Sequence, residues 1–237
     1  MEKEQIYYHF LPSPSQFIID DLKKEKIKIS LIDKLNDPFE LLPYLKYGDF
    51  KKRQLYHNIR RKISKKYGLL CFSKNWHKPL LWGHYADKHK GIAIGFKILK
   101  DKIPFEVKYR SVLKRIKFEL TDNEEENKKL FLNLAEIKSE DWSYEKEYRM
   151  LVKLDDCDKG KNKSFYFMNF TDKLKVDEII LGCQFNKEER GKIIDLAKKL
   201  NVNENKIKHA RQSWGEYKIN KCGTKTNELK IMYSKEK

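Results

Sequence analysis

Two short apolar segments constrain the fold of this chain more than any other feature. Leu69-Leu70-Cys71-Phe72-Ser73 follows a glycine, and Gly91-Ile92-Ala93-Ile94-Gly95-Phe96 begins with one. Apolar runs of four to eight residues bounded by turn residues are typical of buried strands. The sequence therefore predicts two buried strands, at 69–73 and 91–96.

The other segments predict strands and helices that do not alternate strictly. Further strands are expected at 5–10, 27–31, 105–109, 145–154, 164–170, 176–182, 215–219 and 229–233. Helices are expected after Pro14, after Asp37-Pro38, and over 50–67, 77–89, 121–138 and 186–200. Because a doubly wound fold needs regular alternation, we expect an α+β fold instead. It would be a single domain over residues 1–237, with a mixed, mainly antiparallel sheet flanked by helices.

Two helix starts carry recognisable capping residues. Ser13 or Ser15 can cap the first helix, which would turn Phe17, Ile18 and Leu22 toward the core. Asp37 can cap the second, because the proline that follows it is favoured at the first helical position.

The chain is strongly basic. It has 52 Lys and Arg residues against 35 Asp and Glu residues, a net charge of +17. Such a charge attracts polyanions such as nucleic acid, but a lysine-rich genome composition would explain it equally well. If nucleic acid is a partner, the candidate contacts are basic residues of the helix at 50–67, namely Lys51, Lys52, Arg53, Arg60 and Arg61.

The sequence gives no sign of a membrane or metal site. No segment approaches the roughly 18 apolar residues of a membrane span, and the charged N-terminus is not followed by an apolar signal core. We therefore expect a cytoplasmic protein without membrane contact. The four cysteines are Cys71, Cys157, Cys183 and Cys222; they form no CxxC pair, and no metal is expected.

The segment Glu145-Lys146-Glu147-Tyr148-Arg149 is the first candidate for chemistry. On a strand, residues two apart share a face, so Glu145, Glu147 and Arg149 would point the same way. Two carboxyl groups beside a guanidinium can take different pKa values and different roles. On spacing alone, a solvated ladder of charges in which the arginine neutralises the acids is the preferred interpretation.

Aromatic residues give two weaker candidates. Trp82 and Tyr85 share a helix face and could stack on a planar ligand, although a tryptophan is more often part of the core. His9 ends the first strand, where a lone histidine is more often structural than catalytic. The turn Asn36-Asp37-Pro38-Phe39-Glu40 is explained by capping alone, with a ligand role left open for Asn36 and Asp37.

Taken in order, these motifs resemble the bacterial family known as domain of unknown function 2971. That name implies no activity, although some members are associated with defence or toxin-like systems. The resemblance covers about residues 7 to 200, which would leave 201–237 as a C-terminal extension. It rests on Leu35 to Glu40, Cys71-Phe72-Ser73, Leu81 to Ala86, His89 to Phe96, Val107-Lys108-Tyr109, Lys138, Trp142 to Arg149 and Glu178 to Gly182.

The order of parts is also similar to ADP-ribosyltransferase folds of the toxin type. That similarity implies NAD as co-substrate, with His9 on the nicotinamide ribose and Tyr85 stacked on the nicotinamide. Glu147 would stabilise the oxocarbenium-like transition state, and Glu145 would orient or deprotonate the acceptor. The same comparison implies cofactor contacts for Ser73, Trp82 and Arg149, although the strand reads Cys-Phe-Ser where those folds have Ser-Thr-Ser.

Three functional hypotheses follow from the sequence. The first is an NAD-dependent ADP-ribosyltransferase-like effector, a glycosyltransferase acting on nucleic acid in a defence or toxin system. The second is a basic nucleic-acid-binding effector without NAD chemistry. The third is an interaction protein, such as one partner of a toxin–antitoxin operon.

Overall fold

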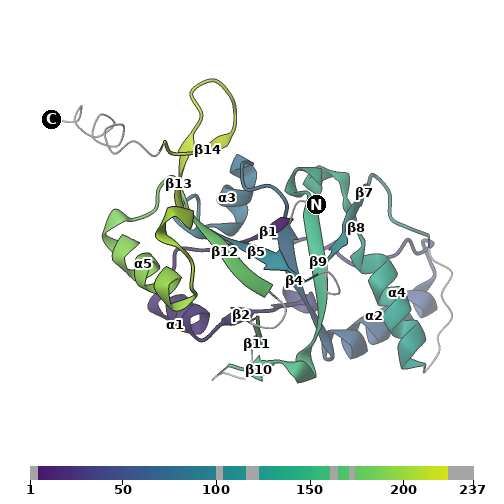
Figure 1. Ribbon diagram of the computed structural model, residues 1–237. Helices are drawn as coiled ribbons and strands as arrows, with labels where there is room; N and C mark the ends of the chain where they lie inside the picture. The colour runs from purple at the N-terminus through teal and green to yellow at the C-terminus, as the bar shows by residue number, and fades with distance from the viewer. Residues whose placement is uncertain (1–4, 100–103, 116–122, 161–164, 171–173, 224–237) are drawn as a thin grey trace.

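A twisted, nine-stranded sheet runs through the computed structural model, which describes residues 5–99, 104–115, 123–160, 165–170 and 174–223 (Figure 1). Its strand order is β14-β13-β12-β5-β1-β4-β9-β6, with β3 paired to β4. The β12–β13 pair is parallel and the other pairs are antiparallel. The predicted α+β fold with a mixed, mainly antiparallel sheet is therefore confirmed.

The strands of this sheet come from all parts of the chain. Their bounds are β1 Ile6–Leu11, β3 Ser30–Leu31, β4 Tyr67–Ser73, β5 Ile92–Ile98, β6 Phe105–Glu106, β9 Glu147–Lys153, β12 Leu174–Leu181, β13 Ile207–Gln212 and β14 Ile219–Lys221. The two predicted buried strands, 69–73 and 91–96, are the central strands β4 and β5. They flank β1 on either side, and both pair with it in the antiparallel direction.

Two smaller sheets complete the strand set of the described residues. One is ordered β10-β11-β2, from Asp158–Lys159, Tyr166–Asn169 and Lys26–Lys28. The other is a parallel pair, β7 Lys108–Arg110 with β8 Ile137–Ser139. Short 3-10 turns lie at Ile32–Lys34, Glu140–Glu145, Leu154–Asp156, Lys187–Glu189 and Glu204–Lys206.

The helices form three groups around the main sheet (Figure 1). α1 Gln16–Lys23 and α5 Arg190–Lys199 pack on one face at the β12 end of the sheet. α3 Pro79–Tyr85 covers the opposite face of the same strands. α2 Phe50–Ser64 and α4 Glu124–Ala135 pack together near β9.

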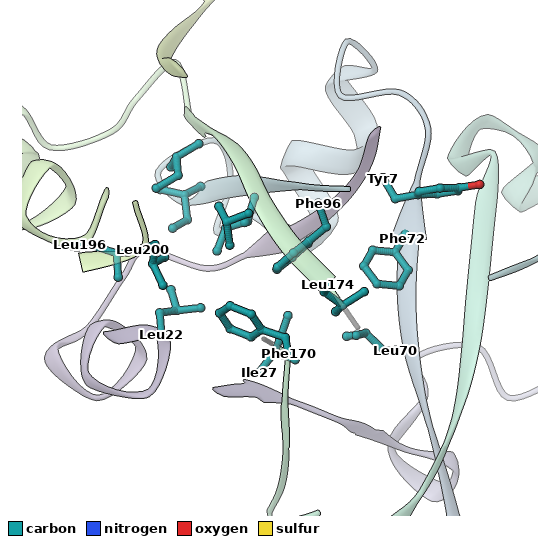
Figure 2. Packing of buried hydrophobic residues seen from close by; sticks show 14 of the residues in the cluster. Tyr7, Leu22, Ile27, Leu70, Phe72, Phe96, Phe170, Leu174, Leu196 and Leu200 are labelled. Carbon is teal, nitrogen blue, oxygen red and sulfur yellow. The ribbon is translucent and has the colours of Figure 1, made fainter. Parts of the chain in front are cut away.

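Strand alternation decides which side chains enter each core layer. In β1, Tyr7 joins Phe72 and Phe96 in the larger core, whereas Tyr8 faces α3 on the other side. Figure 2 shows the larger core, where Leu22 of α1 and Leu196 of α5 lie near each other on one side and Phe96 and Phe72 of the sheet lie on the other.

Several predicted elements differ in the structure. No helix begins at Pro38; residues 38–41 form a turn, and the next helix starts only at Phe50. The capping pattern was misleading because Asp37 Oδ1 accepts a hydrogen bond from the Phe39 amide within the turn itself. In α1 the predicted Leu22 is buried and Ile18 packs partly buried against the core, but Phe17 is exposed and the second buried residue is Ile19.

The strand predictions also need correction. The strand predicted at 105–109 is two strands, β6 and β7, in different sheets, and β8 lies where a helix was predicted. The strand predicted at 27–31 is two short strands, β2 and β3, that join different sheets. β13 was missed, and the strand predicted at 215–219 corresponds to β14, which begins at Ile219. The strand predicted at 229–233 lies outside the described residues.

Within the described ranges, no helix has the length and apolar character needed to cross a membrane.

The backbone of the loop that joins α3 to β5 lies in close contact with Gly182, the residue that follows β12. A Cβ atom added to Gly182 would overlap the carbonyl oxygen of His89, and the Gly182 amide donates to the Gly91 carbonyl at 2.9 Å. Gly191 in α5 has no neighbouring atom within 4 Å of an added Cβ.

We predict that Gly182→Ala lowers the free energy of unfolding by about 2 kcal/mol or more, because a backbone atom cannot move aside as a side chain can. Gly191→Ala is the matched control, with a gain of up to about 1 kcal/mol from helix propensity. Urea unfolding measures both. Equal effects of the two substitutions would contradict the close contact.

Candidate functional site

A cleft of about 300 Å³ opens beside the end of β1 and gathers most of the predicted site residues. His9 comes from β1, Ser73 from the end of β4 and Tyr85 from the end of α3. Glu145 ends the 3-10 turn and Glu147 begins β9. All five line this one cleft.

Sheet register brings these residues together. Tyr8 pairs with Ser73 across β1 and β4, which places His9 one residue from that pair. Ser73 in turn pairs with Glu147 across β4 and β9. The order β1-β4-β9 therefore delivers segments more than 130 residues apart in sequence to one edge of the cleft.

Glu145 and Glu147 do not share a strand face as predicted. Glu145 lies in the 3-10 turn Glu140–Glu145, and Lys146 adopts a left-handed conformation with φ of 47° before β9 starts. The two carboxyl groups nevertheless converge, because both lie within 3.0 Å of the Lys138 ammonium. Only Glu147 and Arg149 share a face through strand alternation.

Lys138 of β8 ties the two carboxyl groups together. Its ammonium lies 2.6 Å from Glu145 Oε2, 3.0 Å from Glu147 Oε2 and 3.3 Å from Glu40 Oε1. The exposed fraction of these four residues is between 2% and 6%. A buried ion cluster of this kind is unlike the solvated charge ladder that spacing alone favoured, so that interpretation is wrong.

Arg149 completes the cluster from the protein interior. Its side chain is fully buried; Nε lies 2.8 Å from Glu147 Oε1 and Nη2 lies 2.6 Å from Glu40 Oε1. Nη2 also donates to Glu147 Oε2, and Nη1 donates to the Ala135 carbonyl. Because Arg149 does not line the cleft and four of its five N–H donors are used, it fixes Glu147 and Glu40 and does not contact a cofactor there.

The environment drives the pKa values of the two carboxyl groups apart. Burial alone would raise the pKa of Glu147, but the charge and hydrogen bonds of Arg149, with the charge of Lys138, outweigh it and lower the pKa to about 2. Burial raises the pKa of Glu145, and the Glu147 charge adds to this against the opposing charge of Lys138. Glu147 is thus a fixed anion, whereas Glu145 is the group suited to exchange a proton.

Neighbouring hydrogen bonds hold Glu145 in place. The Tyr85 hydroxyl donates to Glu145 Oε1 at 2.5 Å and accepts from Asn36 Nδ2 at 3.0 Å. The Ser73 hydroxyl lies 2.5 Å from the Glu145 carbonyl oxygen, to which it can donate. Burial and the Glu145 charge raise the pKa of Tyr85, so its phenol stays protonated as a donor.

The two ring nitrogens of His9 differ in hydrogen bonding within the described residues. Nδ1 lies 2.8 Å from the Cys71 carbonyl oxygen. Because a carbonyl can only accept, Nδ1 carries the proton and Nε2 is the acceptor of the neutral ring. Burial lowers the pKa of His9 despite the opposing hydrogen bond to Cys71, which keeps the ring neutral.

Two predicted contacts lie elsewhere. Trp82 is fully buried under the sheet, does not line the cleft, and its indole nitrogen donates to the Trp76 carbonyl at 2.7 Å. In α2, Arg60 donates to the Glu40 carbonyl at 2.7 Å and so supports the loop below the site.

Lys51, Lys52 and Arg61 are exposed, and Arg53 is half-buried beside Tyr47 and Phe50.

Two charged members of the cluster, Lys138 and Glu40, were not predicted as site residues. The acidic residues nearest to Lys138 in sequence, Glu136 and Glu140, are not its partners in the structure, so only its place among the ordered motifs singled it out. Glu40 ends a turn whose composition was fully explained by capping. In the described part of the chain, no group of three or more His, Cys, Asp and Glu residues is arranged to hold a metal ion.

Comparison with known families gives a match to the middle of the chain. The family described as protein of unknown function (DUF2971) matches residues 81–150. This confirms the resemblance over a segment that includes Tyr85, Lys138, Glu145, Glu147 and Arg149. No curated protein and no solved structure matches the chain.

Loss of one partner should unbalance the buried ion cluster. We predict that Arg149→Met lowers the free energy of unfolding by about 3–5 kcal/mol, because Glu147 and Glu40 lose the cation that compensates their burial. Arg110→Met is the matched control: Arg110 is exposed on β7, and its loss should change stability by less than about 0.5 kcal/mol. Thermal and urea unfolding measure both, and equal stabilities of the two variants would refute the cluster.

Proposed function

We propose that the protein is an NAD-dependent enzyme of the ADP-ribosyltransferase type, which breaks the bond between nicotinamide and ribose. One observation carries this proposal: His9, Tyr85, Glu145 and Glu147, from four separate elements, line one cleft. Their order along the chain is the order that the resemblance to those folds implies. The family match supplies no activity, so the proposal rests on the site.

The cleft suits the nicotinamide–ribose half of NAD. Its volume of about 300 Å³ lies at the lower end of the range for ligand pockets. Nε2 of His9, which has no hydrogen-bond partner among the described residues, can accept a hydrogen bond from a ribose hydroxyl. The exposed lysines Lys28 and Lys34 line the same cleft and can attract the pyrophosphate.

Glu147 and Glu145 have different roles in the proposed reaction because their pKa values differ. As the glycosidic C–N bond breaks, its electron pair leaves with nicotinamide, which becomes neutral, and positive charge develops on the ribose. The permanent anion Glu147 stabilises that charge. A hydroxyl or amino group of the acceptor, or water, then bonds to the anomeric carbon and gives its proton to Glu145 in its ionised form. The raised pKa of Glu145 makes it an effective base near neutral pH.

Nicotinamide release from NAD tests this function. We expect the purified protein to release nicotinamide, and Glu145→Gln to reduce the rate by about 10²–10⁴-fold, the usual contribution of a general base. Glu140→Gln is the matched control, since Glu140 lies in the same 3-10 turn but is exposed. No release, together with no thermal stabilisation by saturating NAD, would refute the proposal.

A basic and aromatic patch favours nucleic-acid binding as a second candidate function, either alone or as the means of holding an acceptor. Tyr47 and Phe50 are 92% and 74% exposed, and the guanidinium of Arg53 lies within 6 Å of both rings. Lys51 and Lys52 extend the patch along α2. Exposed rings beside cations are suited to stacking on bases and contacting phosphates.

Salt-dependent binding of single-stranded RNA and DNA tests this patch. We predict that Lys51→Glu with Lys52→Glu weakens binding and lowers the slope of log affinity against log salt by about 1 for each phosphate that the variant no longer neutralises. Charge reversal at Lys198 and Lys199 on α5, at the other end of the sheet, is the control (Figure 1). Equal decreases in affinity for both double variants would show a non-specific charge effect.

A further inference from the structure

The loop from Asn36 to Leu41 places Glu40 in the lining of the cleft. The Glu40 amide donates to the Asp37 carbonyl at 3.1 Å, and Arg60 of α2 holds the Glu40 carbonyl at 2.7 Å. Leu41 follows in a left-handed conformation with φ of 62°, and its carbonyl accepts a hydrogen bond from Tyr56. Helix α2 therefore fixes the backbone carbonyls of Glu40 and Leu41.

Glu40 uses only one of its two carboxylate oxygens. Oε1 lies 2.6 Å from Arg149 Nη2 and 3.3 Å from the Lys138 ammonium. Oε2 is the one buried side-chain nitrogen or oxygen in the described residues that has no hydrogen-bond partner. Leaving a buried carboxylate oxygen unpaired is costly, and because Glu40 lines the cleft, a positive charge bound there would offset that cost.

The cluster also lacks one positive charge. Three carboxyl groups, of Glu40, Glu145 and Glu147, face two cations, Lys138 and Arg149. With every group ionised, the net charge of the cluster is −1. At the cleft rim the charge is opposite, because Lys28 and Lys34 are exposed there.

We propose that Glu40 makes the cleft selective for a ligand that carries a positive ring deep in the site and a phosphate at the rim. The cationic ring supplies the charge that the cluster lacks, and the rim lysines meet the phosphate. This inference rests on the proposed function and assigns a specificity-determining role to Glu40. It requires that an uncharged ring of the same shape bind less well.

The oxidised and reduced forms of the nicotinamide dinucleotide are suitable probes, since they share their phosphates and differ in ring charge. Calorimetry on the wild-type protein should show at least tenfold tighter binding of the oxidised form, about 1.4 kcal/mol. Glu40→Gln keeps the side-chain shape, removes one negative charge and should bring the two affinities within about threefold. The matched control is Asp37→Asn, because Asp37 is buried in the same loop but does not line this cleft.

The outcomes separate this inference from the proposed function. Nicotinamide release with equal affinities for the two forms would overturn the role of Glu40 and leave the enzyme proposal standing. Absence of both binding and release would overturn both. Should Glu40→Gln fail to fold by circular dichroism, the wild-type affinity ratio decides alone, since a ratio near one contradicts the inference. An equal loss of selectivity in Asp37→Asn would assign the effect to the loop and overturn the specific role of Glu40.

Discussion

The buried contacts of Lys138 and Arg149 with three glutamates are the interaction on which the candidate site depends. Charges are expensive to bury and are tolerated only when paired. Here the pairing joins the 36–41 loop, the short strand β8, the 3-10 turn before β9 and β9 itself. The ladder with β4 holds β9 in register, and the charge pairing attaches the loop, β8 and the 3-10 turn to it. The cleft lies where these elements meet.

The same cluster gives chemically similar residues different roles. Glu147 lies against Arg149 and is held as an anion, whereas Glu145 shares only Lys138 and is further held by the phenol of Tyr85. A fixed anion beside a group that can gain and lose a proton is a common arrangement in acid–base catalysis. Glu40 adds the negative charge that would favour a cationic ligand.

The two proposed activities use different parts of the surface. The cleft lies beside β1, β4 and β9, whereas the exposed rings of Tyr47 and Phe50 lie at the start of α2. Arg60 of α2 connects them physically, because it holds the Glu40 backbone while its helix carries the basic patch. A nucleic-acid acceptor bound on α2 would therefore contact the same helix that supports the floor of the cleft.

The sequence by itself determined the central strands and the α+β class, because apolar runs are local properties of the chain. The similarity in motif order to ADP-ribosyltransferase folds grouped His9, Ser73, Tyr85, Glu145 and Glu147, and the structure places these five residues around one cleft. Tertiary structure alone decided that the 145–149 charges are buried, that Arg149 and Trp82 lie outside the cleft, and that Lys138 and Glu40 belong to the cluster. The reason is physical: the environment of a charge depends on partners from distant segments, and β-sheet register and loop packing bring those partners together only in the folded chain.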